Sequence, residues 1–243
     1  MRNVLVTGGS RGIGLAIVQR LAAAGYGVVA VARRESEELS AAIKAASGGQ
    51  GAIHFLACDL GEIDKISDFV KSVREKFGPL YGLVNNAGIS FEGLLANTHN
   101  SQIEQIVRVN VVSPIVLTKF VVRHMMADGG GRVVNIGSII GSTGYNGLSV
   151  YGATKAAANG FSRSLAREVG RAGITVNTVA PGFIETELTK SLDAEQKGRI
   201  ASRSALRRLP GVDDVASMVE YLLGDGAKNI TGTVMTVDAG NTA

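Results

Sequence analysis

The chain has 243 residues, of which 45% are hydrophobic, a length and composition that suit one large domain with a sizeable core. The net charge of +4 is small and its basic residues are scattered among 21 acidic ones, so nucleic acid is not an expected partner. Cys58 is the only cysteine, which excludes an internal disulfide and leads us to expect a cytoplasmic protein.

Short apolar runs alternate along the chain with longer stretches that carry apolar residues at helical spacing. The first run, residues 3–7, leads into a glycine-rich loop and a helix that stops at Gly25. A crossover helix usually returns the chain to a parallel neighbour, so this alternation predicts an α/β fold. We expect one doubly wound Rossmann-type domain over residues 1–243, with a seven-stranded, mainly parallel sheet and helices on both faces. Further strands are expected at 28–32, 52–57, 83–84, 132–136, 174–179 and 233–237, and helices at 63–77, 101–126, 151–169 and 213–223.

Three further features concern the surroundings of this fold. Because residues 4–6 already belong to the first expected strand, no signal peptide is expected, and no apolar run approaches the length of a membrane span. The three histidines are far apart in the sequence, so we expect no metal site. The polar, charged stretch 185–210 is interpreted as a lid over the substrate site.

The expected helix 101–126 contains two local signals. Ser101 and Glu104 have the spacing of a capping box, which would begin the helix. Pro114 lies well inside the helix and lacks the N–H that would bond the Asn110 carbonyl. We hypothesise that this carbonyl is thereby left available to an ordered water. The alternative is a kink with no functional purpose.

The glycine-rich loop after the first strand has the spacing Gly8-x-x-x-Gly12-x-Gly14. Such a loop brings backbone N–H groups and a helix N-terminus against a pyrophosphate, because glycine permits close approach of the backbone. Its position between a strand and a helix therefore predicts a dinucleotide site.

Charge at the end of the second strand indicates which nicotinamide cofactor is used. An acid there would bind the adenine ribose hydroxyls and repel a 2′-phosphate, but the strand ends in Arg33 and Arg34, and Arg11 lies in the glycine loop. Guanidinium groups bind phosphate well, so we predict NADP(H). The alternative is that these arginines only solvate a surface turn.

Tyr151 and Lys155 lie four residues apart, on one face of an expected helix. A carbonyl reduction needs a proton donor, and a nearby ammonium group favours the phenolate of a tyrosine whose pKa is otherwise about 10. Ser138 follows a strand, where ligands of open α/β sheets bind, and its hydroxyl can bond a substrate oxygen. An i,i+4 pair also arises from ordinary surface packing.

The motifs Thr7–Gly14, Asn85–Gly88 and Tyr151–Lys155, in this order, resemble those of the short-chain dehydrogenase/reductase family. The resemblance extends to Pro181-Gly182 and to Ile230–Gly232. It implies a catalytic tetrad with Tyr151 as acid/base, Lys155 as ribose binder that shifts the tyrosine pKa, Ser138 as substrate orienter and Asn110 as holder of a relay water. It also implies a cofactor site made of Gly8, Ser10, Arg11, Gly12, Ile13, Gly14, Arg33, Arg34, Asp59, Leu60, Asn86, Ala87, Gly88, Tyr151, Lys155 and Ile184. In that site Asp59 and Leu60 hold the adenine, Asn86 to Gly88 the adjoining ribose and Ile184 the carboxamide.

Within the family, the sequences of residues 136–141 and 179–186 are similar to those of the 3-oxoacyl-[acyl-carrier-protein] reductases of fatty acid synthesis. The resemblance implies a homotetramer and a substrate on acyl carrier protein. One departure concerns the turn 128–131, which reads Asp-Gly-Gly-Gly where those reductases have a carrier-binding arginine. The cations expected to meet an acidic carrier are Arg171, Arg199, Arg203, Arg207 and Arg208, which otherwise only solvate the surface.

Two alternatives to this function remain at this stage. One is a reductase or dehydrogenase of the same family acting on another small ketone, alcohol, polyol or acyl-CoA. The other is a dinucleotide-binding regulator without turnover.

Overall fold

Within the residues that the computed structural model describes, 1–184 and 194–243, seven parallel strands form one sheet in the order β3-β2-β1-β4-β5-β6-β7. This confirms the predicted fold class. The strands are β1 (Asn3–Thr7), β2 (Gly27–Ala32), β3 (Ala52–Ala57), β4 (Leu80–Asn85), β5 (Gly131–Ile136), β6 (Ile174–Pro181) and β7 (Val234–Val237). The α-helices are α1 (Gly12–Ala23), α2 (Glu37–Ala46), α3 (Ile66–Phe77), α4 (Asn100–Val107), α5 (Ser113–Asp128), α6 (Ser149–Val169), α7 (Ala194–Arg203) and α8 (Val212–Leu223).

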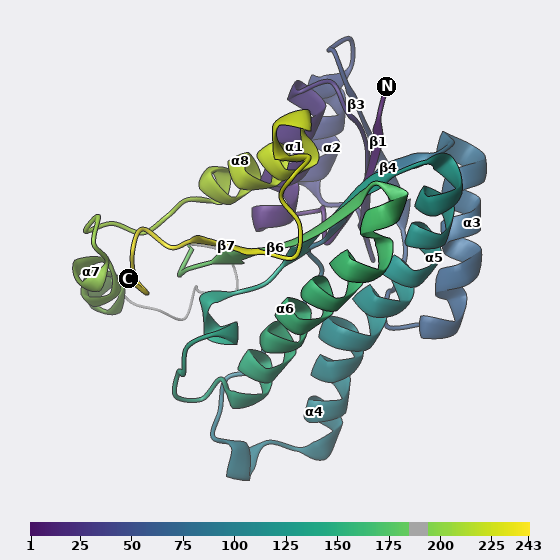
Figure 1. The fold of residues 1–243 in the computed structure, drawn as a ribbon. Helices are drawn as coiled ribbons and strands as arrows, with labels where there is room; N and C mark the ends of the chain where they lie inside the picture. Colours follow the sequence, from purple (N-terminus) through teal and green to yellow (C-terminus); the bar gives the residue numbers. More distant parts are fainter. Residues whose placement is uncertain (185–193) are drawn as a thin grey trace.

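Helices cover both faces of the sheet, as Figure 1 shows. On one face α1, α2 and α8 pack together over an apolar core, and on the other α3, α5 and α6 do the same. Because the inner strands are buried on both sides, β1 and β2 are almost continuous apolar runs rather than alternating ones.

Helix α2 is absent from the ranges expected from the sequence. Its start is nevertheless encoded locally: the Ser36 hydroxyl accepts a hydrogen bond from the Leu39 N–H at 3.1 Å, and Glu37 and Glu38 occupy the first turn. The same hydroxyl donates to the Ser10 carbonyl at 2.6 Å. Ser36 therefore ties the start of α2 to the glycine-rich loop.

The single helix expected at 101–126 is divided in the structure. Helix α4 is followed by a π-helical turn, Arg108–Val112, and then by α5, with Pro114 in its first turn. A π-helical turn is wider than an α-helical one, and proline is well suited to the first turn of a helix. The expected capping box was wrong, because α4 begins one residue earlier and the Gln102 side chain accepts from the His99 N–H at 3.1 Å.

The stretch Asn100–Asp128 is long and apolar enough, by length and composition, to cross a membrane, with a hydropathy of 1.5 over its most apolar window. The expectation that no apolar run approaches this length was therefore wrong. Leu117, Val121 and Met125 in α5 are fully buried in the core. A core helix meets the same criterion as a span, so the finding alone does not indicate a membrane segment.

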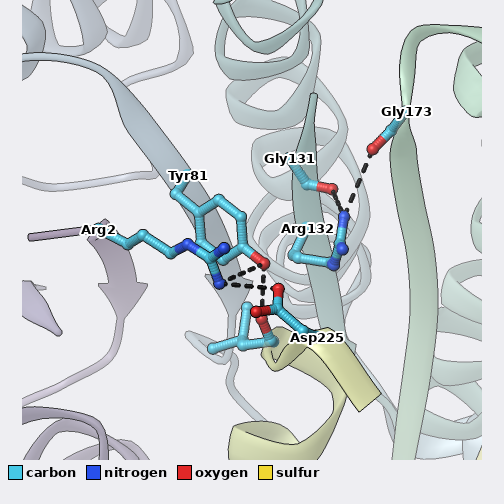
Figure 2. Close-up of polar contacts among 7 residues, drawn as sticks. Arg2, Tyr81, Gly131, Arg132, Gly173 and Asp225 are labelled. Carbon is cyan, nitrogen blue, oxygen red and sulfur yellow. Dashed lines mark hydrogen bonds and ion pairs between the residues drawn. The ribbon is translucent and has the colours of Figure 1, made fainter. Parts of the chain in front are cut away.

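The amino ends of the central strands are joined by a cluster around Tyr81 (Figure 2). The Tyr81 hydroxyl donates to the Leu223 carbonyl at 2.8 Å, while the Arg2 guanidinium lies 4.4 Å from the ring centroid and pairs with Asp225 at 2.9 Å. Arg132 lies 5.5 Å from the same centroid. These contacts connect β1, β4 and β5 with the end of α8 at the sheet edge opposite the predicted site.

Replacement of Tyr81 by Phe should lower the thermal midpoint by a few degrees and leave kcat unchanged. The variant leaves the partly buried Leu223 carbonyl without its donor, which costs about 1–2 kcal/mol in a domain of this size. Calorimetry and steady-state kinetics on the same preparation measure both quantities. An unchanged midpoint, or a fall in kcat beyond twofold, would contradict this prediction.

Candidate active site

The predicted site residues lie in loops at the carboxyl edge of the sheet and in the nearby helices. Residues 8–14 follow β1, residues 33–34 follow β2, residues 59–60 follow β3 and residues 86–88 follow β4. Ser138 follows β5 and Ile184 follows β6, while Tyr151 and Lys155 lie in the first two turns of α6. Because the strands are parallel, segments far apart in the sequence meet at this one edge.

Close packing holds the glycine-rich loop against the segment after β4. A Cβ on Gly14 would lie 2.0 Å from the Gly8 carbonyl oxygen and 2.5 Å from Asn86 Nδ2, and Gly8 has a φ of +65°. Both positions therefore require glycine. The Asn86 amide donates to the Thr7 carbonyl at 2.9 Å and to the Gly8 carbonyl at 3.2 Å.

Thr7 also belongs to the site, although no role was predicted for it from the sequence. Its buried hydroxyl accepts hydrogen bonds from the N–H groups of Asn86 and Ala87, both at 3.0 Å, and donates to the Val84 carbonyl at 3.3 Å. Threonine occurs in the first motif, but its partners lie about 80 residues away, so no local pattern could reveal them. Thr7 thus joins the loops after β1 and β4, with α1 beginning beside them.

The three arginines predicted to bind the 2′-phosphate of the cofactor are exposed and lie near the start of α2. Arg33 and Arg34 directly follow β2, and Arg11 directly precedes α1. The hydrogen bond between Ser36 and Ser10 holds these two segments together. Two separate loops therefore contribute guanidinium groups to the same region, and no acid ends β2.

The remaining predicted cofactor residues lie in two loops, one after β3 and one after β6, which are not adjacent in the sheet. Asp59 follows β3 closely, and its carboxylate accepts from the Gly61 N–H at 2.8 Å, which fixes the turn that also holds Leu60. Ile184 lies after β6, is 4% exposed and is the last residue described before residue 185. The first part of the predicted lid, residues 185–193, lies outside the described residues, whereas α7 covers residues 194–203.

Asn110 lies in the π-helical turn and is 8% exposed. Its side chain clamps Ile89, accepting from the N–H at 2.9 Å and donating to the carbonyl at 2.8 Å. It also donates to the Thr154 hydroxyl at 3.1 Å, and that hydroxyl donates to the Tyr151 carbonyl at 2.7 Å. Thr154, which the sequence analysis did not single out, therefore links Asn110 to the helix that carries Tyr151.

Lys155 is buried, and its Nζ donates to the Ile136 carbonyl at 2.8 Å. Burial lowers the pKa of Lys155 to about 8, because the charged form loses hydration. A Cβ on Gly88 would lie 3.3 Å from Asn110 Oδ1 and 3.7 Å from Lys155 Nζ. Lys155, Asn110 and the loop after β4 thus meet at one point.

The Tyr151 ring centroid lies 5.6 Å from Lys155 Nζ. The nearby ammonium group of Lys155 is expected to make this phenol more acidic, but in the protein itself burial raises the pKa of Tyr151. A hydrogen bond with the Ser138 side chain opposes this rise and favours the phenolate. The expectation was wrong for the protein alone, because burial outweighs the hydrogen bond and Lys155 directs its ammonium to the Ile136 carbonyl.

These observations define the class of the protein: a Rossmann-type fold in which a glycine-rich loop and a tyrosine–lysine–serine group meet at the carboxyl edge is a dinucleotide-dependent oxidoreductase. Residues 2–197 match the family model described as short chain dehydrogenase. The chain belongs to the short-chain dehydrogenase/reductase family, which confirms the resemblance inferred from the motifs.

Individual relatives cover almost the whole chain. The 3-oxoacyl-[acyl-carrier-protein] reductase FabG of Escherichia coli (strain K12) is 40% identical over 236 residues, which are 97% of this chain and 95% of that protein. A short chain dehydrogenase from Burkholderia cenocepacia J2315 in complex with NADP is 36% identical, with a TM-score of 0.92 and coverage of 100% and 98%. A gluconate 5-dehydrogenase from the same organism, in complex with NADP and tartrate, is 29% identical, with a TM-score of 0.93 and coverage of 99% and 95%.

Proposed function

We propose that this protein is an NADPH-dependent ketoreductase that reduces 3-oxoacyl thioesters, on acyl carrier protein, to 3-hydroxyacyl thioesters in fatty acid synthesis. The observation that carries the proposal is the convergence of Asn110, Ser138, Tyr151 and Lys155 at the carboxyl edge, beside a glycine-rich loop. Likeness to the Escherichia coli reductase over nearly the whole chain supports the substrate class.

The residues of the site suit NADP(H). Gly8, Gly12 and Gly14 leave the backbone and the N-terminus of α1 open to a pyrophosphate, and a side chain at Gly14 would collide with the Gly8 carbonyl. Arg33 and Arg34, with Arg11, would hold the 2′-phosphate. In the same proposal Ser10 and Ile13 complete the glycine-rich loop. Asp59 and Leu60 hold the adenine, Asn86, Ala87 and Gly88 the adjoining ribose, and Ile184 the carboxamide.

The reaction needs a hydride and a proton, and bound NADPH supplies the hydride to the carbonyl carbon. Tyr151 donates its phenolic proton to the carbonyl oxygen, while the Ser138 hydroxyl bonds that oxygen and orients the ketone. Lys155 binds ribose hydroxyls and keeps a positive charge beside the phenolate that forms. Asn110 holds the water through which Tyr151 regains a proton from solvent.

The rate of ketone reduction should fall above about pH 8. Lys155 has a pKa lowered to about 8, so its charge is present below that pH and lost above it, and the neutral amine cannot offset the negative charge that forms on Tyr151 as it donates its proton. We expect kcat/KM to decline about tenfold per pH unit on this side of the profile. Replacement of Lys155 by Arg, whose guanidinium has a higher pKa and stays charged, should move the decline to higher pH. A decline that is identical in the variant would contradict the assignment.

A substrate panel tests the function. NADPH oxidation is followed with acetoacetyl thioesters of acyl carrier protein and of CoA, and with unrelated ketones and polyol-derived ketones. Turnover restricted to thioesters supports the proposal. Faster turnover of a sugar-acid ketone would favour the alternative, to which the gluconate 5-dehydrogenase likeness points. No turnover with any of these ketones would favour the other alternative, a dinucleotide-binding regulator.

Carrier recognition is the finer part of the proposal. The turn at 128–131 lacks an arginine, and Asp128 is bound through both oxygens by Arg74, at 2.5 and 2.7 Å. Arg171, Arg207 and Arg208 are exposed, and Arg199 pairs with Glu195. We propose that these cations and Arg203 form the acidic-carrier contact. A lower KM for the carrier-bound thioester than for the CoA thioester, rising with salt, is the expected result.

We further propose one domain over residues 1–243, with 185–210 as the substrate-binding lid, that assembles as a cytoplasmic homotetramer. An open apolar groove of about 400 Å³ supports self-association; Val112 and Ile115, which follow its lining residue Val111 in the sequence, are 39% and 38% exposed. Its apolar lining is Leu95, Ile103, Val107, Val111, Val150 and Ala153. Light scattering tests this directly: four times the chain mass of 25.2 kDa is expected, and a monomer would refute the assembly.

A further inference from the structure

A row of polar side chains crosses the centre of the sheet, close to the site. Asn85 of β4, Asn135 of β5 and Thr178 of β6 lie in register on neighbouring strands. They are 6%, 3% and 0% exposed. Central strands of a parallel sheet are ordinarily apolar, because a buried polar group costs free energy unless it is hydrogen-bonded. The presence of this row therefore calls for a physical reason.

Hydrogen bonds join the row to the helices above it. Asn85 Nδ2 donates to Asn135 Oδ1 at 2.8 Å and to the Thr118 hydroxyl of α5 at 2.9 Å. Asn135 Nδ2 donates to the Ser162 hydroxyl of α6 at 2.8 Å, and Ser162 shares a hydrogen bond of 2.8 Å with the Thr178 hydroxyl. One continuous network thus connects three strands with two helices.

The members of this network adjoin the groups of the site. Asn135 immediately precedes Ile136, whose carbonyl accepts from Lys155 Nζ, and it lies three residues before Ser138. Ser162 is on α6, the helix that carries Lys155. A change in the height of α6 on β5 would therefore move the ammonium relative to both its carbonyl partner and the serine.

The network is not explained by stability alone. Asn85 Oδ1 is buried and has no hydrogen-bond partner among the described residues. A partly satisfied buried network stabilises a fold less than apolar side chains of the same shape would. Its members therefore have a use other than stability, and geometry at the site is the use that their positions indicate.

We infer that Asn135, Ser162 and Thr178 are positioning residues: their hydrogen bonds hold α6 at a fixed height on β5 and β6, so that Lys155 and Tyr151 face Ser138. The inference rests on the proposed function only in that the site must reduce a ketone. Small displacements of reacting groups reduce kcat strongly, whereas Lys155 is only one of many proposed cofactor contacts, most of which lie in other loops.

The chain offers a matched pair of substitutions on one strand. Thr178→Val removes a hydroxyl that belongs to the network, whereas Thr175→Val removes a buried hydroxyl of β6 that has no hydrogen-bond partner among the described residues. Both changes keep the side-chain shape. We expect Thr178→Val to lower kcat about tenfold, with the KM for ketone and the Kd for NADPH changed less than twofold, and Thr175→Val to leave all three unchanged.

Two further variants complete the test. Ser162→Ala should resemble Thr178→Val, and Thr178→Ser, which keeps the hydroxyl, should restore kcat. The assay uses whichever ketone of the panel the unaltered protein reduces fastest, so failure of the thioester assignment does not decide this question. Wild-type kcat in both Thr178→Val and Ser162→Ala would overturn the inference, even if their thermal midpoints fall. Equal losses of kcat in Thr178→Val and Thr175→Val would also overturn it.

Discussion

Replacement of Tyr151 by Phe should lower kcat about a hundred- to ten-thousandfold while the Kd for NADPH stays within about twofold of its original value. The substitution deletes the proton donor and leaves the ring, its burial and the neighbouring Lys155 in place. Single-turnover reduction of the best ketone measures the chemical step, and fluorescence titration measures cofactor binding.

The matched control for this prediction is Tyr145→Phe. Tyr145 is 43% exposed and its ring packs against Phe183 at 5.4 Å, so the same loss of a hydroxyl falls near the site without touching Lys155. We expect its kcat to remain within about twofold. Retained turnover in Tyr151→Phe, or an equal loss in both variants, would refute the assignment of Tyr151 as the acid.

Replacement of Arg33 by Asp should shift the ratio of kcat/KM for NADPH to that for NADH by about a hundredfold toward NADH. A hydrogen bond to a charged group contributes about 1.5–3 kcal/mol, and each 1.4 kcal/mol corresponds to a factor of ten. The new carboxylate would also repel the 2′-phosphate and accept from the ribose hydroxyls of NADH.

Lys44→Asp serves as the control for the cofactor prediction. Lys44 is exposed in the last turn of α2, so this variant makes the same change in net charge at the other end of the helix. Its cofactor ratio should stay close to that of the unaltered protein at physiological salt. An unshifted ratio in Arg33→Asp would contradict the prediction that the arginines after β2 select NADP(H). Equal use of both cofactors by the unaltered protein would also contradict it.

Features that depend on short stretches could be predicted from the sequence. The glycine spacing from Gly8 to Gly14, the apolar runs and the pair Tyr151–Lys155 are local patterns, and all lie in the elements expected of them. Helix α2 shows that even a local signal can be overlooked, because its Ser36 cap and acidic first turn were available in the sequence.

Other features required the fold. Pro114 indicates an interruption of the helix near Asn110, but no residue pattern predicts the π-helical form of Arg108–Val112 or the contacts of Asn110 with Ile89 and Thr154. The environment of Lys155 likewise could not be predicted from the sequence. Its partner Ile136 lies 19 residues earlier, and its burial, which lowers the pKa to about 8, arises from elements that pack around it.

The sequence by itself determined the order of the strands and of most helices, the family motifs and the type of chemistry that the side chains permit, because periodicity and glycine spacing are properties of neighbouring residues. The tertiary structure alone decided which distant groups meet: Thr7 with Asn86, Asn110 with Thr154, and the polar row that joins Asn135 to Ser162. The physical reason is that burial and hydrogen bonding between strands depend on the register of the sheet and on helix packing, which the whole chain sets together.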